Sequence, residues 1–210
     1  MPSDPNSADS APTTSEAAKT ILLLRHGSTD LVASCLCGQM PGVSLNENGR
    51  REAKILALRL PAIDVLVSSP LERAWETALI IAKMRGLRPL ACEAFIERNF
   101  GRWTGMPFAY LDAGSFWARL DAPDGDTADN CESITEVHTR AISALNNIIA
   151  TNAFARTIAV VSHSAVIRVL LTHAANIPLS SYLQFSIYPG SISVVTYCEP
   201  NCFHVLRVNE

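Results

Sequence analysis

Thr20-Ile21-Leu22-Leu23-Leu24-Arg25-His26-Gly27 is a short apolar run that ends in an arginine, a histidine and a glycine. A continuous apolar run of this length is typical of a strand buried on both faces of a parallel sheet. The glycine that follows lets the backbone turn close to a ligand. We therefore expect a buried strand that delivers Arg25 and His26 to an open crevice.

Further strands are predicted from the same kind of pattern. Asp64–Ser68 and Thr157–Ser162 are apolar in the same continuous way, and Leu90–Phe95 is a weaker candidate. Ser191–Tyr197 and Phe203–Val208 are separated by a Glu-Pro-Asn turn, which predicts a C-terminal hairpin.

Helical periodicity occupies the intervals between these strands. The predicted helices are Asn48–Leu60, Leu71–Met84, Ser133–Ile149 and Ala165–Ala175, with a less regular one near Pro107–Leu120. Gly86 lies just past the second helix, and Ser133-Ile-Thr-Glu136 matches a capping box. Strands that alternate with helices predict an α/β fold, a three-layer α/β/α sandwich with a mostly parallel central sheet.

Length and composition indicate one domain. The chain has 210 residues, and 48% of them are hydrophobic, enough for a substantial core. Residues 1–19 are rich in Ser, Ala, Pro, Thr and Asp, so we expect a disordered N-terminal tail before a single catalytic domain over residues 20–210. Residues 121–130 are polar and are predicted to form a loop.

Charge and hydropathy restrict the partners. With 17 basic and 20 acidic residues the net charge is −3, so the broad basic field of a nucleic-acid-binding protein is absent. The sequence shows no secretory signal, no presequence and no apolar run long enough to cross a bilayer. We expect a cytoplasmic protein that acts on a small molecule, with neither nucleic acid nor membrane as a partner, and leave a homodimer open.

The six cysteines predict neither a metal site nor a disulfide framework. Cys35 and Cys37 lie in a polar loop with no second pair to complete a zinc site. Cys198 and Cys202 flank the hairpin turn and are expected to face each other. Without a sign of export, we expect free thiols.

Candidate catalytic residues follow three of the predicted strands. Arg25 and His26 come after the first strand, Arg73 begins the helix after the second, and His163 follows Thr157–Ser162. Ligands of such sheets bind beyond the carboxyl ends of the strands, and helix N-termini there attract phosphate oxygens. The shared position predicts a phosphate site.

The residue types fit phosphoryl transfer. Arg25 and Arg73 can each bind phosphoryl oxygens in a bidentate way and favour a neutral His26 beside them. A neutral imidazole can attack phosphorus and form a covalent intermediate. His163 would donate to a phosphoryl oxygen, and Glu97 is our candidate for the acid that protonates the leaving group.

Each of these residues also has a simpler interpretation. Arg73 could pair with Glu72 or Glu76 on a solvated helix face, and Glu97 with Arg98 in a surface ion pair. His163 could be a core histidine. The remaining histidines show no such grouping and are expected to be structural; they are His138, His173 and His204.

The sequence resembles the histidine phosphatase superfamily, also called phosphoglycerate mutase-like. The motifs that carry the resemblance are Leu24–Thr29, Val67–Ala78, Glu97–Gly105 and Val161–Arg168, and Gly38–Gly49 also fits. The resemblance implies His26 as nucleophile, Arg25, Arg73 and His163 around the phosphoryl group and Glu97 as proton donor. It also implies that no metal or cofactor takes part. Ser28, Gln39 and Ser164 are candidates for further phosphate or substrate contacts.

The sequence departs from the family pattern in two places. Ser164-Ala165 stand where glycines often follow the second histidine, and a usually short passage is stretched over Pro123–Ser133. These departures affect the expected substrate geometry and leave the core chemistry unchanged.

The motif Phe100-Gly-Arg-Trp-Thr-Gly105 resembles the phosphatase branch of the superfamily. Together with Ile167-Arg168 it is similar to α-ribazole-phosphate phosphatases, so we expect hydrolysis of a small phosphomonoester, with α-ribazole phosphate as one candidate. Three alternatives remain: a phosphoglycerate mutase, a phosphatase of phosphohistidine proteins, and a relative that only binds phosphate. Phe108–Trp117 is predicted to cover a small substrate.

Overall fold

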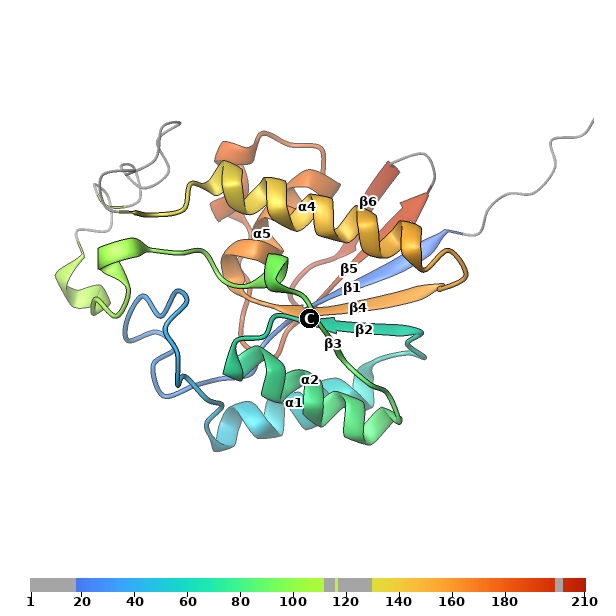
Figure 1. Cartoon of the computed structure of the whole chain (residues 1–210), viewed down its shortest axis with the longest axis horizontal. Helices are drawn as coiled ribbons and strands as arrows, with labels where there is room; N and C mark the ends of the chain where they lie inside the picture. The colour runs from blue at the N-terminus through green and yellow to red at the C-terminus, as the bar shows by residue number, and fades with distance from the viewer. Residues whose placement is uncertain (1–17, 112–115, 117–129, 199–201) are drawn as a thin grey trace, which may run out of the picture.

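A six-stranded sheet forms the centre of the molecule (Figure 1). The computed structural model describes residues 18–111, 116, 130–198 and 202–210. The strands are β1 (Lys19–Arg25), β2 (Val65–Ser68), β3 (Leu90–Ala91), β4 (Thr157–Ser162), β5 (Ile192–Cys198) and β6 (Cys202–Arg207), in the order β3-β2-β4-β1-β5-β6. The first four in space are parallel, and β5 and β6 are antiparallel. The predicted α/β fold with a mostly parallel sheet is therefore confirmed.

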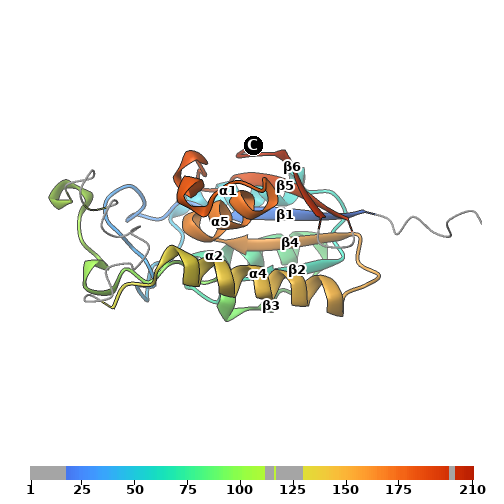
Figure 2. The same ribbon diagram turned by 90° about the horizontal axis from the view of Figure 1, so that it is seen from above.

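Helices cover both faces of the sheet. In Figure 1, α1 (Glu47–Arg59) and α2 (Glu72–Arg85) lie below it, and α4 (Ile134–Thr151) and α5 (Ser164–Ala174) lie above it. Figure 2, seen from the side of α4 and α5, shows β1, β4 and β2 side by side. None of the helices among the described residues is long and apolar enough to span a membrane.

The continuous apolar pattern of β1 follows from this three-layer arrangement. Ile21 and Leu23 pack into the core on the side of α4 and α5, whereas Leu22 and Leu24 pack into the core on the side of α1 and α2. Successive side chains of a strand point to opposite faces, so a strand covered on both faces must be apolar at every position.

The predicted Gly86 end and the predicted Ser133–Glu136 capping box both form, and α1 has a cap of its own. Asn46 caps α1 by accepting a hydrogen bond from the Gly49 N–H, and Gly86 ends α2 with a φ of 67°. Both bonds of the Ser133–Glu136 capping box are present at the start of α4. Gly86 is suited to its position because an L side chain is strained at positive φ.

Two predicted boundaries were wrong. Leu90–Phe95 forms only the two-residue strand β3 and then a 3₁₀ turn, η1 (Glu93–Phe95), which inserts Phe95 into the core while Leu90 stays exposed at the sheet edge. Lys19 was assigned to the tail but starts β1, where its buried ammonium group donates to the carbonyls of Ala153 and Ala155 near the end of α4.

Several predicted segments fall mostly outside the described residues. They are the tail through residue 17, the polar loop at 121–129, and most of the helix and cover proposed for 107–120. The described part of the last segment contains a 3₁₀ turn, η3 (Phe108–Tyr110). In the hairpin, Cys198 and Cys202 face each other in register as expected, and both are free thiols.

Candidate active site

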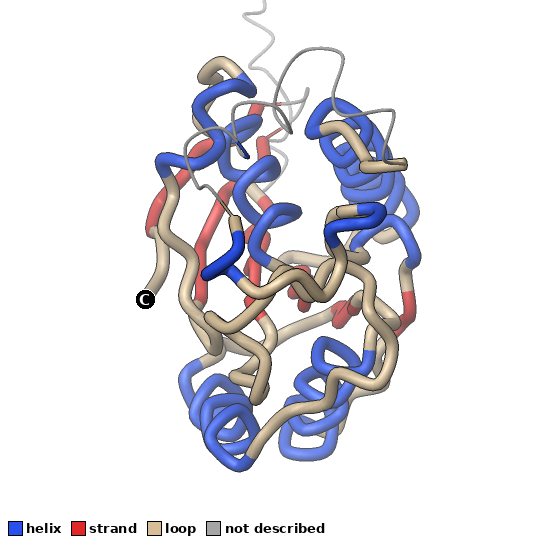
Figure 3. The backbone as a smooth tube through the Cα atoms, turned by 90° about the vertical axis from the view of Figure 1, so that its left-hand side faces the viewer, coloured by secondary structure: helices blue, strands red, loops and turns tan. Residues whose placement is uncertain are grey.

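The carboxyl ends of β2, β4 and β1 lie next to one another at one edge of the sheet. Arg25 pairs in register with Ser162, and Ser68 with Val161, so the residues that follow these strands emerge at the same level. Figure 3 is seen from this side of the molecule, with helices above and below the strand ends. A cavity of about 410 Å³ lies here, and its lining includes Arg25, His26, Arg73, Glu97 and Ser164. The structure thus brings these five predicted residues together.

His26 is held so that one ring nitrogen faces the cavity. The residue is 4% exposed, and its Nδ1 lies 2.8 Å from the Gly27 carbonyl oxygen. A neutral imidazole can only donate to that oxygen, so Nδ1 carries the proton and Nε2 keeps its lone pair. Burial, followed by the charges of Arg25 and Arg73, holds the pKa of His26 well below its ordinary value. Nε2 therefore carries a free lone pair on a neutral ring, which is what a nucleophilic attack requires.

Arg25 and Arg73 are each anchored through one nitrogen. Nη1 of Arg25 donates to the Ile187 carbonyl at 2.5 Å, and Nη2 of Arg73 donates to the Gly38 carbonyl at 2.6 Å. Burial lowers the pKa of Arg25 to about 10 and that of Arg73 below its ordinary value. Both guanidinium groups remain protonated at neutral pH, so the site is strongly positive.

His163 lies next to His26. It is fully buried, and its ring centroid is 5.1 Å from that of His26. Its Nε2 contacts the Ser69 hydroxyl at 2.8 Å. Burial, with the charge of Arg73 next, holds the pKa of His163 well below its ordinary value. The Ser69 contact fixes the ring in place, and the unpartnered Nδ1 next to His26 distinguishes His163 from a core histidine with both ring nitrogens satisfied.

Three buried nitrogens in this site have no hydrogen-bond partner among the described residues: Nε of Arg25, Nη1 of Arg73 and Nδ1 of His163. A buried polar atom without a partner costs about 1–3 kcal/mol, so such atoms are rare in folded proteins. Their grouping beside His26 indicates a missing acceptor. A phosphoryl group offers several acceptor oxygens and the negative charge that two guanidinium groups require.

The Glu97 carboxylate is oriented by backbone groups. Its Oε1 accepts hydrogen bonds from the N–H of Arg98 at 2.9 Å and from the N–H of Ala165, in the first turn of α5, at 3.2 Å. Both bonds go to the same oxygen. The carboxylate is thereby held at the cavity wall, with Oε2 available for a ligand.

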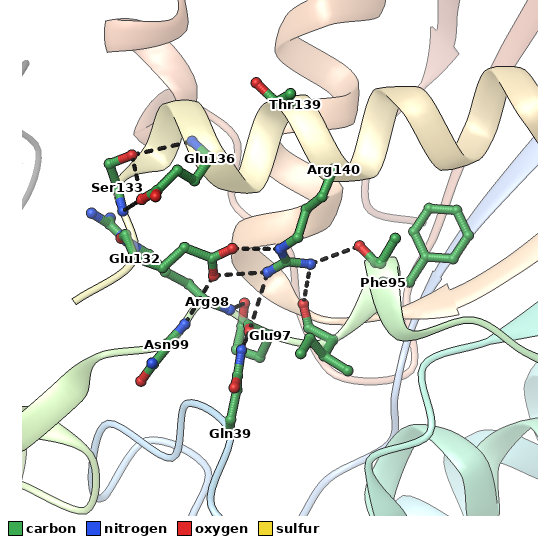
Figure 4. A network of polar contacts seen from close by, with 12 residues as sticks. Gln39, Phe95, Glu97, Arg98, Asn99, Glu132, Ser133, Glu136, Thr139 and Arg140 are labelled. Carbon is green, nitrogen blue, oxygen red and sulfur yellow. Dashed lines mark hydrogen bonds and ion pairs between the residues drawn. The ribbon is translucent and has the colours of Figure 1, made fainter. Parts of the chain in front are cut away.

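Arg140 of α4 holds the segment that carries Glu97 (Figure 4). It donates to the carbonyls of Ala94 at 2.6 Å, Ile96 at 2.8 Å and Glu97 at 3.3 Å, and it pairs with Glu132 through two nitrogens at 2.5 and 2.9 Å. Oε2 of Glu132 in turn accepts from the Asn99 N–H at 3.1 Å. Bidentate arginine contacts of this kind fix both position and orientation.

The simpler interpretation of Arg73 does not hold. Glu72 accepts from the Gly42 N–H at 2.8 Å, and Glu76 pairs with Arg50 at 3.0 Å, so neither carboxylate engages Arg73. His138 and His173 lie outside the cavity lining and contact each other at 3.3 Å between Nε2 and Nδ1.

Two predicted substrate contacts lie outside the cavity lining. Ser28 is bound to Glu52 through its N–H at 2.7 Å and its hydroxyl at 2.8 Å. Gln39 donates from Nε2 to the Glu97 carbonyl at 2.8 Å, so its amide supports the Glu97 segment. Neither residue is in the lining formed by Arg25, His26, Arg73, Glu97 and Ser164, and the fully buried His163 is not part of that lining either.

Two residues near the site were missed. Thr77 accepts from the Gly27 N–H at 3.1 Å and donates to the Arg73 carbonyl at 2.8 Å, which ties the nucleophile loop to α2. Arg168 lines the cavity one helical turn after Ser164. Thr77 comes four residues after Arg73, and Arg168 four residues after Ser164. Residues four apart lie on the same face of a helix, so this spacing is the sequence pattern that could have indicated both.

Cys37 and Cys35 also line the cavity, with their sulfur atoms 3.8 Å apart. Burial raises the pKa of the Cys37 thiol to about 11, so this thiol stays protonated. Within the described ranges, no group of three histidine, cysteine or acidic side chains is arranged to hold a metal ion.

A family model and a curated relative match nearly the whole chain. The model described as Histidine phosphatase superfamily (branch 1) matches residues 21–210. Phosphoserine phosphatase 1 of Hydrogenobacter thermophilus is 28% identical over 199 residues, covering 90% of this chain and 91% of that protein. The chain spans 53% of the length of three other curated relatives.

Solved structures share the architecture. The mycobacterial glucosyl-3-phosphoglycerate phosphatase superposes with a TM-score of 0.80 at 26% identity, covering 91% of this chain and 99% of that one. The α-ribazole phosphatase from Shigella flexneri superposes with a TM-score of 0.78 at 24% identity, covering 91% and 96%, and so has the same fold.

Proposed function

Because the chain belongs to the histidine phosphatase superfamily, branch 1, we propose that it hydrolyses a small phosphomonoester, without a metal ion, through a phosphohistidine on His26. The family and the phosphatases among its relatives make it a phosphoric monoester hydrolase. The observation that carries the mechanism is the set of three unpartnered buried nitrogens beside His26. We assign the activity to one catalytic domain that begins with β1.

In the first step, Nε2 of His26 attacks phosphorus and forms a P–N bond while the ester P–O bond breaks. Arg25, Arg73 and His163 donate to the phosphoryl oxygens and stabilise the charge that develops in the transition state. The leaving alkoxide takes a proton from Glu97 and departs as an alcohol. The Gly27 carbonyl keeps its hydrogen bond to Nδ1–H and stabilises the phosphorylated ring.

In the second step, water attacks the phosphohistidine. Glu97, now a carboxylate, accepts the proton of the water molecule, the new P–O bond forms and the P–N bond breaks. Inorganic phosphate leaves, and His26 returns to its neutral form. Glu97 regains its proton in this step, so the cycle closes without another reactant.

The cavity supports a small organic substrate. Its volume exceeds what a phosphoryl group alone requires, and its wall includes Val32, Leu36, Phe100 and Phe108. The candidates are α-ribazole phosphate, phosphoserine and phosphorylated glycerates, the last two suggested by the names of the relatives. The net charge of −3 favours a small-molecule substrate over nucleic acid, and we place the activity in the cytoplasm.

The test measures phosphate release from a panel of phosphomonoesters in excess chelator, for wild type and His26→Ala. The panel contains an aryl phosphate, α-ribazole phosphate, phosphoserine and 3-phosphoglycerate. We expect release by the wild type, none above background by His26→Ala, and trapping of ³²P-phosphohistidine after an acid-free quench. Activity that requires added metal, or that survives in His26→Ala, would overturn the mechanism.

A further inference from the structure

Arg168 carries a positive charge into the cavity that the phosphoryl chemistry does not use. It lies on α5, one turn after Ser164, and both residues line the cavity. Its Nε donates to the Phe185 carbonyl at 2.8 Å, which fixes the direction of the side chain. Neither Nη group of Arg168 has a partner among the described residues, and the same is true of the Ser164 hydroxyl.

The charge of Arg168 is close enough to affect the phosphate-binding residues. It is one of the charges that lower the pKa of Arg25, after burial. The two arginines therefore face a common space, with Arg25 and Arg73 committed to the phosphoryl group. A third guanidinium group beside them is electrostatically costly unless the ligand supplies a second negative charge.

We propose that Arg168 and Ser164 form a subsite for a carboxylate that the substrate carries in addition to its phosphate. The substrate class is then phosphorylated hydroxy acids and amino acids. This inference rests on the proposed function, because it assigns a second anchor to a substrate whose phosphate lies beside His26.

A carboxylate fits this subsite better than a second phosphate does. The free Nη groups of Arg168 present the two parallel donors that bind both oxygens of a carboxylate. The phosphoryl site uses two guanidinium groups and two imidazoles for one phosphate, whereas the subsite offers one guanidinium group and one hydroxyl.

The experiment compares kcat/KM for 3-phosphoglycerate and glycerol 3-phosphate, which differ only in a carboxylate replaced by a hydroxymethyl group. We measure wild type, Arg168→Met, Arg168→Lys and the control Arg51→Met, an exposed arginine of α1. The selectivity ratio for the carboxylated ester should fall at least about tenfold in Arg168→Met, recover partly in Arg168→Lys and stay constant in Arg51→Met. Because both kcat/KM values are measured on the same variant, a general loss of activity or of folded protein cancels in the selectivity ratio.

Phosphoserine and phosphoethanolamine form a second pair that differs by a carboxylate, and the same change in ratio is expected. Equal losses on both members of each pair would overturn the subsite. A bisphosphate turned over faster than 3-phosphoglycerate, with the same dependence on Arg168, would overturn the carboxylate assignment. If the wild type released phosphate from no ester, the proposed function would fail; an active wild type without selectivity contradicts the subsite alone.

Discussion

At the scale of single residues, the hydrogen bond between His26 and the Gly27 carbonyl determines which ring nitrogen can attack phosphorus in the proposed mechanism. A histidine with the opposite tautomer would present a proton to phosphorus instead of a lone pair. Arg25 and Arg73 reinforce this choice, because their charges favour the neutral ring. The nucleophile is thus prepared before the substrate arrives, and binding energy is not spent on deprotonating it.

Replacing Glu97 by glutamine should slow the reaction according to the leaving group. The amide cannot supply a proton, so kcat/KM for an alkyl phosphate should fall about 10²–10⁴-fold. An aryl phosphate should lose much less, since a phenolate leaves without protonation. The comparison is made by steady-state phosphate release, with Glu93→Gln, an exposed carboxylate of η1, as the matched control. Equal losses on both esters would remove Glu97 from the acid role.

The sequence was informative about residues whose position follows from the chain itself. Arg25, His26 and His163 follow buried strands directly, so the sheet alone places them together. Ser28 and Gln39 could not be placed, because their side chains lie in loops whose partners come from elsewhere in the fold. The tautomer of His26 and the unpartnered nitrogens beside it depend on atomic distances that no pattern encodes.

At the scale of elements, α4 holds the segment of Glu97, the proposed acid, although none of its residues lines the cavity. Arg140→Met removes the contacts to the Ala94, Ile96 and Glu97 carbonyls. We expect kcat to fall more for an alkyl than for an aryl phosphate, because a displaced Glu97 protonates less efficiently, while KM for the aryl ester changes little. Arg207→Met, an exposed arginine of β6, is the control.

If Arg140→Met lowered kcat equally for the alkyl and the aryl phosphate, Arg140 would contribute only to the stability of the fold. Thermal unfolding of the same variants separates a loss of stability from a displaced Glu97. A loss of stability lowers the melting temperature but reduces the activity on the alkyl and aryl esters by the same factor.

Close packing between α1 and the nucleophile loop predicts a large effect of a single methyl group. A Cβ atom at Gly49 would lie 2.1 Å from the Ser28 carbonyl oxygen and 2.7 Å from its nitrogen. Backbone atoms cannot move aside as a side chain can, so Gly49→Ala should lower the free energy of unfolding by about 1–3 kcal/mol or more. Urea denaturation measures this, with the exposed Lys54→Ala in the same helix as the control. An unchanged midpoint would contradict the packing.

Helices and strands were predicted correctly where a single physical rule determines the local structure. β1, β2 and β4 are buried on both faces, so their apolar runs predicted them directly. Gly86 at the end of α2 and the capping box of α4 are local features and were visible in the sequence. Leu90–Phe95 was mispredicted because its apolar residues serve different purposes: Leu90 lies exposed on the edge strand, and Phe95 fills the core from a 3₁₀ turn.

At the scale of the whole molecule, the buried histidines make stability depend on pH. Burial holds the pKa values of His26 and His163 well below 6.5, the ordinary value that the unfolded chain restores. Below pH 6.5 the unfolded chain therefore binds protons that the folded protein does not, and stability is lost as the pH falls. Each of these histidines should contribute about 1.4 kcal/mol per pH unit in that window.

The slope is measured by urea denaturation between pH 5.5 and pH 7, a range that avoids most of the titration of carboxylates such as Asp64, whose pKa is lowered in the folded protein. His163→Asn should reduce the slope, whereas His204→Asn, an exposed histidine on β6, should leave it unaltered. A slope that is the same in wild type and His163→Asn would show that this histidine titrates equally in the folded and unfolded chains.

The order of the strands also has a consequence for how the protein is made. β1 leaves the ribosome well before its neighbours in the sheet, β4 and β5, which begin at Thr157 and Ile192. The apolar residues of β1 therefore have no partner strand until most of the chain has been translated. His26, which follows β1, is synthesised early but gains its neighbour His163 only after β4, so a ribosome-bound chain that stops before β4 has neither a closed sheet nor the proposed phosphatase site.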